Sequence, residues 1–284
     1  MSRRFFLIFT GLLVVIAACT SSPGAPVVPT TAPSAAPTSA PSVAPSAEAV
    51  DLTIFAAASL KGALEAAKEA YVAANPGTTL TVSTDSSAAL ATQIEEGAPA
   101  DVFLSADAKN PQALVEKGLT DGAAVDFAGN KLVVIVPTDN PGAIRTPADL
   151  AKPGVKIVAA GAEVPITKYA MQLVENLANE PGYPADFLPA YVANTVSMED
   201  NVKAVVAKLE LGEGDAAIVY VTDAKISTEV ASVHVPDAAN VLATYAGVVV
   251  KATDNPEAAN AFLAWLAGPA GQAILSGFGF LPPS

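Results

Sequence analysis

The chain has 284 residues, of which 51% are hydrophobic, and its formal net charge at pH 7 is −13. This acidic balance argues against binding to nucleic acid or through a polybasic membrane patch, because both depend on clustered Lys and Arg. It does not exclude binding of a small anion at short range, since net charge is screened beyond about 8–10 Å. The residues after about position 48 suffice for one large domain or two smaller ones.

The first 18 residues are predicted to be a signal peptide. Arg3 and Arg4 form a basic start, an apolar run follows from Phe5 to Ile16, and small residues precede Cys19. The alternative is a transmembrane helix, but the run is shorter than the roughly 20 residues needed to span a membrane. The small residues and Cys19 together resemble a bacterial lipobox, which predicts lipidation at Cys19. As the only cysteine, Cys19 leaves none for a disulfide, a thiolate metal site or a nucleophile.

Residues 19–49 are predicted to be a tether. They consist almost entirely of Pro, Ala, Ser, Thr and Val, with prolines recurring every few residues. Such a segment cannot pack a core and favours an extended, partly polyproline conformation. We expect it to hold the folded part outside the cell membrane, and a glycosylated stalk would have the same geometry.

The rest of the chain alternates between short apolar strands and helices. Strands are predicted at 52–58, 79–84, 101–106, 132–137, 155–160, 191–196, 215–220 and 245–251. Helices are predicted at 60–74, 87–96, 110–117, 166–178 and 202–209, from 256 and after 269. This alternation predicts an α/β fold with mixed, mainly parallel sheets flanked by helices. Two successive sets predict two lobes, 50–131 plus 240–284 and 132–239, joined by crossings near the apolar strands at Leu132 and Tyr245.

Four of the predicted helices begin just after a strand, where ligands bind in open α/β sheets. Each helix start has unpaired N–H groups and about half a positive charge, which suits an anion without any Lys or Arg. The candidate contacts are the hydroxyls of two serines and one tyrosine and the backbone N–H groups of two aliphatic residues: Ser59, Ser87, Tyr220, Ile166 and Val202. Ser59 and Ser87 also read as simple helix caps, with Ser86 as a competitor for the second cap.

Four segments carry a resemblance to a known family. FAAASL (55–60), SSAALATQIEEGAPADVFLSAD (86–107), VPITKYA (164–170) and ELGEGDAAIVYVTDA (210–224) resemble the periplasmic molybdate-binding proteins of ABC importers, and the match runs from about Leu52 to the C-terminus. The resemblance implies the type II periplasmic-binding-protein fold and a monomeric receptor that delivers molybdate or tungstate to a membrane permease. The resemblance further implies that the protein is not an enzyme and needs no cofactor.

The resemblance also implies how the oxyanion is held. Only hydrogen bonds contact it, from the side chains and backbones of Ser59 and Ser87, the backbones of Ile166 and Val202, and the Tyr220 hydroxyl, and no side chain coordinates the metal directly. The chain departs from the family at Ile166-Thr167, where Ala-Gly is common, and at Asp85, whose carboxylate would repel a dianion unless it points away or caps the helix.

Other polar residues have simpler interpretations. His234 is predicted to lie in a late strand with a structural role, Asp101 and Asp107 to make local hydrogen bonds, Trp265 to pack in the core, and Lys61 and Lys168 to face solvent. A receptor of the same fold for sulfate, phosphate or an organic anion is the main alternative. A serine hydrolase is a further one, but the chain has no G-x-S-x-G motif and its one histidine is far from both serines in sequence.

Overall fold

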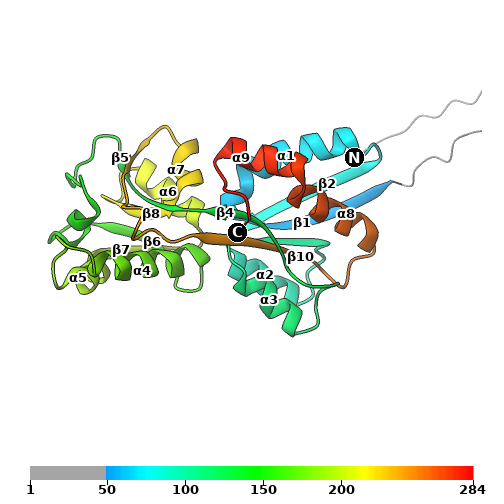
Figure 1. Cartoon of the computed structure of the whole chain (residues 1–284), viewed down its shortest axis with the longest axis horizontal. Helices are drawn as coiled ribbons and strands as arrows, with labels where there is room; N and C mark the ends of the chain where they lie inside the picture. Colours follow the sequence, from blue (N-terminus) through cyan, green and yellow to red (C-terminus); the bar gives the residue numbers. More distant parts are fainter. Residues whose placement is uncertain (1–48, 284) are drawn as a thin grey trace, which may run out of the picture. The chain divides into compact units, whose positions relative to one another are not determined.

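The computed structural model describes residues 49–283, which belong to one compact unit, Ala47–Ser284. The predicted signal peptide, Cys19 and nearly all of the tether lie outside the described residues. Figure 1 shows the elements of this unit gathered into two groups, which we call lobe I and lobe II. Lobe I contains β1–β4, β10, α1–α3, α8 and α9, and lobe II contains β5–β9 and α4–α7.

Lobe I is built on a five-stranded sheet in the order β2-β1-β3-β10-β4. Its strands are β1 (Val50–Ala57), β2 (Thr78–Asp85), β3 (Val102–Ser105), β4 (Val125–Asn130) and β10 (Ala243–Val249). Its helices are η1 (Ala58–Leu60), α1 (Lys61–Ala74), α2 (Ser87–Glu95), α3 (Lys109–Glu116), α8 (Pro256–Ala267) and α9 (Pro269–Phe278). β1 pairs in parallel with β2 and β3, whereas β10 runs antiparallel to β3 and β4.

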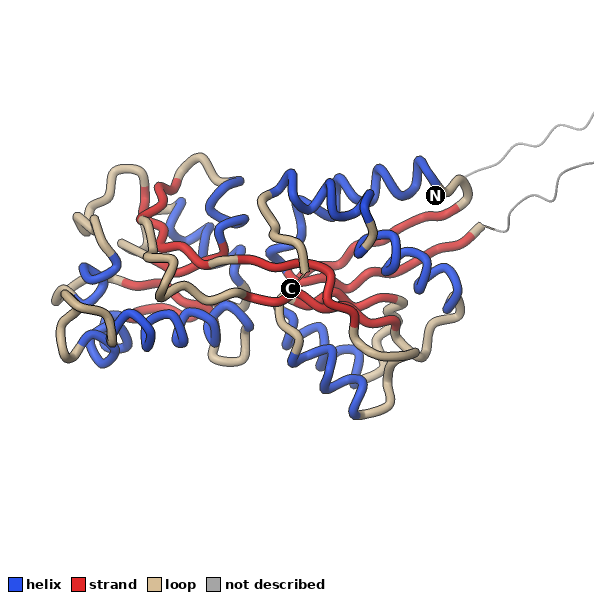
Figure 2. The backbone as a smooth tube through the Cα atoms, viewed as in Figure 1, coloured by secondary structure: helices blue, strands red, loops and turns tan. Residues whose placement is uncertain are grey.

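The lobe I sheet is covered on both faces because successive strand residues point to opposite sides. Ile54 belongs to the core shared with α1 and α8, while its neighbour Phe55 belongs to a second core with Leu90 of α2 and Leu114 of α3. Trp265 of α8, predicted to pack in the core, is half-buried at the edge of the core and packs edge-on against Tyr71 of α1. Figure 2 shows α1 above the strands of this lobe and α2 and α3 below them.

Lobe II combines a three-stranded sheet, β8-β5-β9, with the parallel pair β6-β7. Its strands are β5 (Leu132–Pro137), β6 (Ile157–Ala160), β7 (Thr195–Glu199), β8 (Ala217–Tyr220) and β9 (Val230–Val233). Its helices are η2 (Pro147–Ala151), α4 (Pro165–Ala178), α5 (Phe187–Asn194), α6 (Val202–Glu210) and α7 (Val221–Ile226). A parallel bridge between Ile157 and Ala216 links the two sets of strands.

Two sequence predictions in lobe II were wrong. The strand expected at 191–196 begins only at Thr195, because residues 187–194 form α5, which buries Phe187 and Tyr191 four residues apart on one helical face. His234 is exposed and follows β9, which ends at Val233. In lobe I, strand β4 was not predicted from the sequence.

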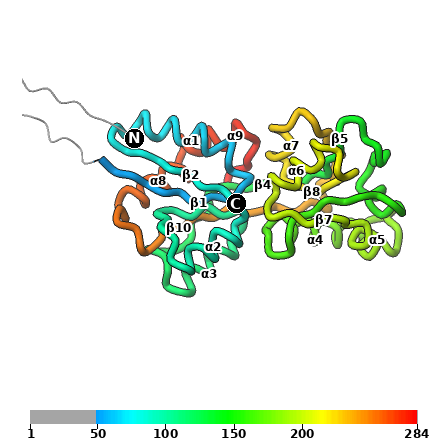
Figure 3. The backbone as a smooth tube through the Cα atoms, turned by 180° about the vertical axis from the view of Figure 1, so that it is seen from behind, coloured from blue at the N-terminus to red at the C-terminus, as the bar shows by residue number. Residues whose placement is uncertain are grey.

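The chain passes between the lobes twice, at Lys131 between β4 and β5 and again in the segment before β10, as Figure 3 shows from behind. The exact lobe boundaries at 131/132 and 239/240 stay a prediction. Within residues 49–283, no single helix has the length and apolar character to cross a membrane, and only α8 and α9 taken together would pass, with a 56° bend between them.

Candidate functional site

A small cavity of about 10 Å³ lies between the lobes. It is lined by Ala57, Ala58, Ser59, Ser86, Ser87 and Ala106 from lobe I and by Val164, Pro165, Ile166, Asn201, Val202 and Tyr220 from lobe II. All five residues predicted as ligand contacts are therefore brought together, although their contact with a ligand stays a prediction. This volume is far below the roughly 300–1,000 Å³ of pockets for drug-sized ligands, so only a very small ligand fits the cavity.

Ser59 lies in η1, directly after β1, and is only 5% exposed. The prediction that it caps the following helix is wrong. The turn η1 delays the start of α1 to Lys61, whose N-cap position is Leu60 and has no side-chain cap. Instead, the Ser59 hydroxyl lies 2.9 Å from the hydroxyl of Tyr245 on β10.

Tyr245 connects Ser59 to a buried polar chain beneath the cavity. The Asn130 amide donates to Thr222 Oγ1 at 2.9 Å and approaches the Tyr245 hydroxyl oxygen at 3.5 Å. Either hydroxyl of the Ser59–Tyr245 pair can be the donor, and one arrangement has Tyr245 donating its hydrogen to Ser59. The Ser59 hydrogen is then free to point into the cavity.

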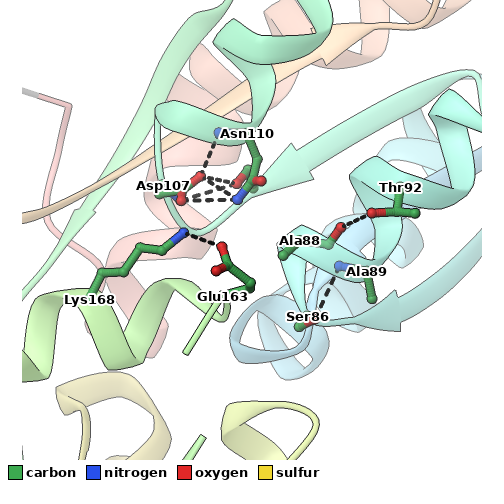
Figure 4. A network of polar contacts seen from close by, with 9 residues as sticks. Ser86, Ala88, Ala89, Thr92, Asp107, Asn110, Glu163 and Lys168 are labelled. Atoms are coloured by element: carbon green, nitrogen blue, oxygen red, sulfur yellow. Dashed lines mark hydrogen bonds and ion pairs between the residues drawn. The ribbon is translucent and has the colours of Figure 1, made fainter. Parts of the chain in front are cut away.

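Ser87 lies at the start of α2 and is 1% exposed. The cap of α2 is its competitor Ser86, whose hydroxyl accepts from the Ala89 N–H at 3.2 Å (Figure 4). The prediction of Ser87 as cap was wrong because it lies one residue inside the helix. Its hydroxyl oxygen accepts from the Ala106 N–H at 3.0 Å, which again leaves the hydroxyl hydrogen as a donor.

In lobe II, α4 begins at Pro165, which has no N–H and fixes the helix entry. The Thr167 N–H bonds to Val164, and the Thr167 hydroxyl donates to the Ala160 carbonyl at 2.8 Å. Thr167 is absent from the cavity lining, so its hydroxyl neither crowds the site nor adds a contact. Among the described residues, the Ile166 N–H has no backbone acceptor.

The start of α6 resembles the start of α4 in its hydrogen bonding. Asn201 is its N-cap, and the Asn201 side-chain oxygen accepts from the Lys203 and Ala204 N–H groups at 3.1 and 3.2 Å. The N–H of Val202, the first helical residue, has no backbone acceptor within residues 49–283. At the starts of α4 and α6, the neighbouring backbone N–H groups therefore have acceptors, whereas the N–H groups of Ile166 and Val202 remain available at the cavity.

Tyr220 ends β8, and its side chain is 1% exposed. Its hydroxyl is buried without a hydrogen-bond partner in the described structure. Burial, and secondarily the neighbouring tyrosines and carboxylates, raises the pKa of Tyr220 well above its usual value. The hydroxyl therefore remains protonated at neutral pH and is a hydrogen-bond donor.

None of the residues that line the cavity has a charged side chain. The helix starts at η1/α1, α2, α4 and α6 each bring about half a positive charge, so the site is electropositive without Lys or Arg. The lining also includes no His, Asp or Glu that could act as a general base for either serine. The arrangement can hold an anion through neutral hydrogen-bond donors.

The other polar residues behave mostly as expected. Asp107 accepts hydrogen bonds from Ser105 and Asn110, and Asp101 accepts from the Thr53 N–H at 2.6 Å. Lys168 does not simply face solvent, because it pairs with Glu163 at 3.4 Å (Figure 4).

Sequence reasoning missed three residues that organise the site, namely Tyr245, Asn130 and Asn201. Asn201 could have been found, because an asparagine directly before a helical apolar pattern is a preferred N-cap. Tyr245 and Asn130 could not, since their proximity to Ser59 and to each other depends on β10 lying between β3 and β4.

Comparison with known proteins gives three kinds of match. Residues 52–281 match the family model for bacterial extracellular solute-binding proteins. The molybdate-binding protein ModA of Mycobacterium tuberculosis strain H37Rv is 36% identical over 233 residues, covering 82% of this chain and 85% of that protein. The substrate-binding domain assigned to a molybdenum ABC transporter from Clostridium difficile aligns with a TM-score of 0.62 and 32% identity, over 83% of this chain and all of that one.

A further structural neighbour is the sulfate-binding protein SubI from Mycobacterium tuberculosis H37Rv. It aligns with a TM-score of 0.73 at 22% identity, over 82% of this chain and 87% of that one. At this identity the likeness shows the shared two-lobed fold alone and carries no information about the anion.

Proposed function

This chain belongs to the family of bacterial extracellular solute-binding proteins, and we propose that it captures molybdate outside the cell membrane and delivers it to an ABC importer. The relatives at 36% and 32% identity, one a molybdate-binding protein and one a molybdenum-transporter domain, support molybdate as the ligand. The observation that carries the proposal is the small cavity between the lobes, with the unpartnered Tyr220 hydroxyl and without charged side chains in its lining.

The donors of the cavity match the chemistry of a tetrahedral dianion. Such an anion is fully ionised at neutral pH and offers only acceptor oxygens. Ser59, Ser87 and Tyr220 would each donate a hydroxyl hydrogen, and the backbones of Ser59, Ser87, Ile166 and Val202 would donate N–H groups. These contacts would satisfy the buried Tyr220 hydroxyl, which otherwise costs about 1–3 kcal/mol as an unmade hydrogen bond.

The proposed ligand includes tungstate as well as molybdate. Both are tetrahedral dianions of nearly equal size, and the donors meet only oxygen atoms. Binding would need no cofactor and no direct coordination of the metal by a side chain. The chain would act by capture and release, and not as an enzyme.

The remaining parts of the proposal concern the N-terminal segments, which lie almost entirely outside the described residues, and the movement of the two lobes. Residues 1–18 would be removed as a signal peptide, and lipid on Cys19 would anchor a monomeric receptor to the outer face of the cell membrane. The tether of residues 19–49 would leave the binding unit free to meet its permease. Within that unit, 50–131 plus 240–284 and 132–239 would move as two lobes that close on the ligand.

A thermal-shift panel with the full chain tests the ligand. Molybdate and tungstate should raise the unfolding temperature strongly, because a ligand that binds only the folded state stabilises it by mass action. Sulfate and phosphate at equal concentration serve as the competing oxyanions. If either of them stabilised the chain more than molybdate, the receptor would belong to that anion instead. Isothermal titration with the best two anions would then give their affinities.

The hydrolase alternative can be tested separately with an acyl-serine probe. We expect no labelling of Ser59 or Ser87, because the cavity lining offers no general base to activate either hydroxyl. Covalent labelling at either position would restore the hydrolase interpretation.

A further inference from the structure

A hydrogen bond between the two lobes lies beside the cavity, in addition to the buried Asn130–Thr222 bond. The Asn201 amide, just before α6 in lobe II, donates to the carboxylate of Asp85, at the end of β2 in lobe I, at 3.1 Å. The same carboxylate oxygen accepts from the Ser86 N–H at 2.7 Å. Asp85 thus points away from the cavity, whose lining does not include it.

This pair lies where the cavity meets the surface. A broad groove of about 870 Å³ opens outside the cavity, and Ser86, Val164 and Asn201 line both spaces. Asp85 lines only the groove. The Asp85–Asn201 hydrogen bond therefore crosses the cleft at the mouth of the cavity.

Each of the two side chains is held in place by backbone N–H groups of its own lobe. The Asn201 oxygen is held by the Lys203 and Ala204 N–H groups, so its amide hydrogens remain for Asp85. The Asp85 carboxylate is held in turn by the Ser86 N–H. The hydrogen bond between them thus fixes the start of α2 against the start of α6, and these starts carry Ser87 and Val202.

Asp85 is otherwise hard to reconcile with an anion site. The groove is already acidic, since it is lined by Asp85, Glu95, Glu163, Glu199 and Asp200 and by no Lys or Arg. A carboxylate two residues before Ser87 weakens the binding of an anion through repulsion, unless it contributes something that offsets this cost. A hydrogen bond to a charged acceptor across the cleft supplies that contribution.

We propose that Asp85 and Asn201 form a latch across the mouth of the cavity that slows release of the bound oxyanion, an inference that rests on the proposed function for the identity of its ligand. The latch forms as the lobes meet and must break before the ligand leaves. It therefore acts on the dissociation rate more than on the association rate.

Three variants of the full chain isolate the latch. Asp85→Ala removes the acceptor, and Asn201→Ser keeps a favourable helix cap but is too short to cross the cleft. The third combines both changes. Glu163→Gln is the matched control, because it removes a carboxylate from the same groove whose partner, Lys168, belongs to the same lobe.

Stopped-flow dissociation of molybdate gives the first readout. Each single variant should release molybdate faster, on the order of tenfold for loss of a charged hydrogen bond. The double variant should be no faster than the faster single one, because both changes break the same bond. Glu163→Gln should release it at the wild-type rate. Tighter binding by Asp85→Ala would show that repulsion dominates, and multiplying effects in the double variant would show independent roles. Either result would overturn the latch.

Hydrogen exchange without ligand gives a second readout that does not depend on molybdate. Asp85→Ala should speed exchange at the start of α6 in the opposite lobe, and Asn201→Ser should speed it at the start of α2. Exchange that changes only in the mutated lobe would overturn the latch. Wild-type chain that fails to bind molybdate would instead refute the proposed function, and the exchange result would still decide the latch.

Discussion

The two lobes supply the cavity with different kinds of donors. In lobe I, the hydroxyls of Ser59 and Ser87 are already held by Tyr245 and by the Ala106 N–H. In lobe II, the Tyr220 hydroxyl is buried without a partner. Lobe I therefore presents a half-site that is formed before a ligand arrives, whereas lobe II contains a donor that only a ligand satisfies. The same substitution, loss of a hydroxyl, should then have opposite effects on the ligand-free protein in the two lobes.

Ser87→Ala should have the largest combined effect, because the hydroxyl has two roles. Binding of molybdate should weaken by about 1.5–3 kcal/mol, the value of a hydrogen bond to a charged group. The Ala106 N–H also loses its acceptor, so the ligand-free free energy of unfolding should fall by about 1–3 kcal/mol. Isothermal titration and urea denaturation measure the two quantities. Ser276→Ala, an exposed serine on α9, is the control that should change neither.

Unchanged stability of ligand-free Ser87→Ala would break the contrast between the lobes. It would mean that the bond between Ser87 and Ala106 does not hold the hydroxyl in place. A loss of stability with full affinity would instead remove Ser87 from the ligand contacts.

Tyr220→Phe should separate binding from stability. Molybdate affinity should fall by about 1.5–3 kcal/mol, as for the serine. The ligand-free free energy of unfolding should stay the same or rise, because the variant no longer buries a hydroxyl without a partner. Tyr245→Phe is the mirror-image control, since its hydroxyl bonds to Ser59 and its loss should destabilise the ligand-free protein. Unchanged affinity in Tyr220→Phe would exclude this hydroxyl from the site.

Alkaline pH should lower the free energy of unfolding, because burial raises the pKa values of several tyrosines. Burial, with a smaller effect of Asp107, raises the pKa of Tyr169 to about 12, and burial raises those of Tyr191, Tyr220 and Tyr245 as well. The folded state retains these protons, while the unfolded chain releases them near pH 10. The contribution of these tyrosines to the free energy of unfolding is therefore fully present below about pH 10. For Tyr169, this contribution should be lost as the pH rises through about 12.

Urea denaturation at a series of pH values measures this loss. Tyr169→Phe should make the decline shallower, because one group whose pKa differs between the two states is gone. A flat dependence of the unfolding free energy on pH between 10 and 12 in the wild-type chain would contradict the prediction.

The sequence was enough to predict the general architecture and the gathering of the donors. Apolar strands followed by helix starts placed Ser59, Ser87, Ile166, Val202 and Tyr220 at strand ends, and all five line one cavity. This worked because each strand end and helix start is a local pattern. The choice of these five among other positions came from the family resemblance.

Non-local features could not be predicted in the same way. Tyr245 reaches Ser59 only because β10 enters the sheet between β3 and β4, and a β-bulge at Tyr245 and Ala246 further alters the pairing there. The cap assignments failed by one or two residues, since η1 and the adjacent Ser86 shift the helix starts without changing the apolar pattern. The direction of Asp85 depends on Asn201 in the other lobe, which no pattern in the sequence connects to it.

Ile166→Val should give the smallest change. It tests whether Ile166 contacts the ligand through its backbone N–H and not through its side chain. Ile166 is 2% exposed and packs in the core, so loss of one methylene should lower the unfolding free energy by about 0.5–1.5 kcal/mol. Molybdate affinity should not change, because the proposed contact is the N–H, which Val supplies equally. Isothermal titration beside urea denaturation tests both. A clear loss of affinity would mean that the side chain itself shapes the cavity, and the donors of lobe II would then depend on packing as much as those of lobe I depend on their hydrogen bonds.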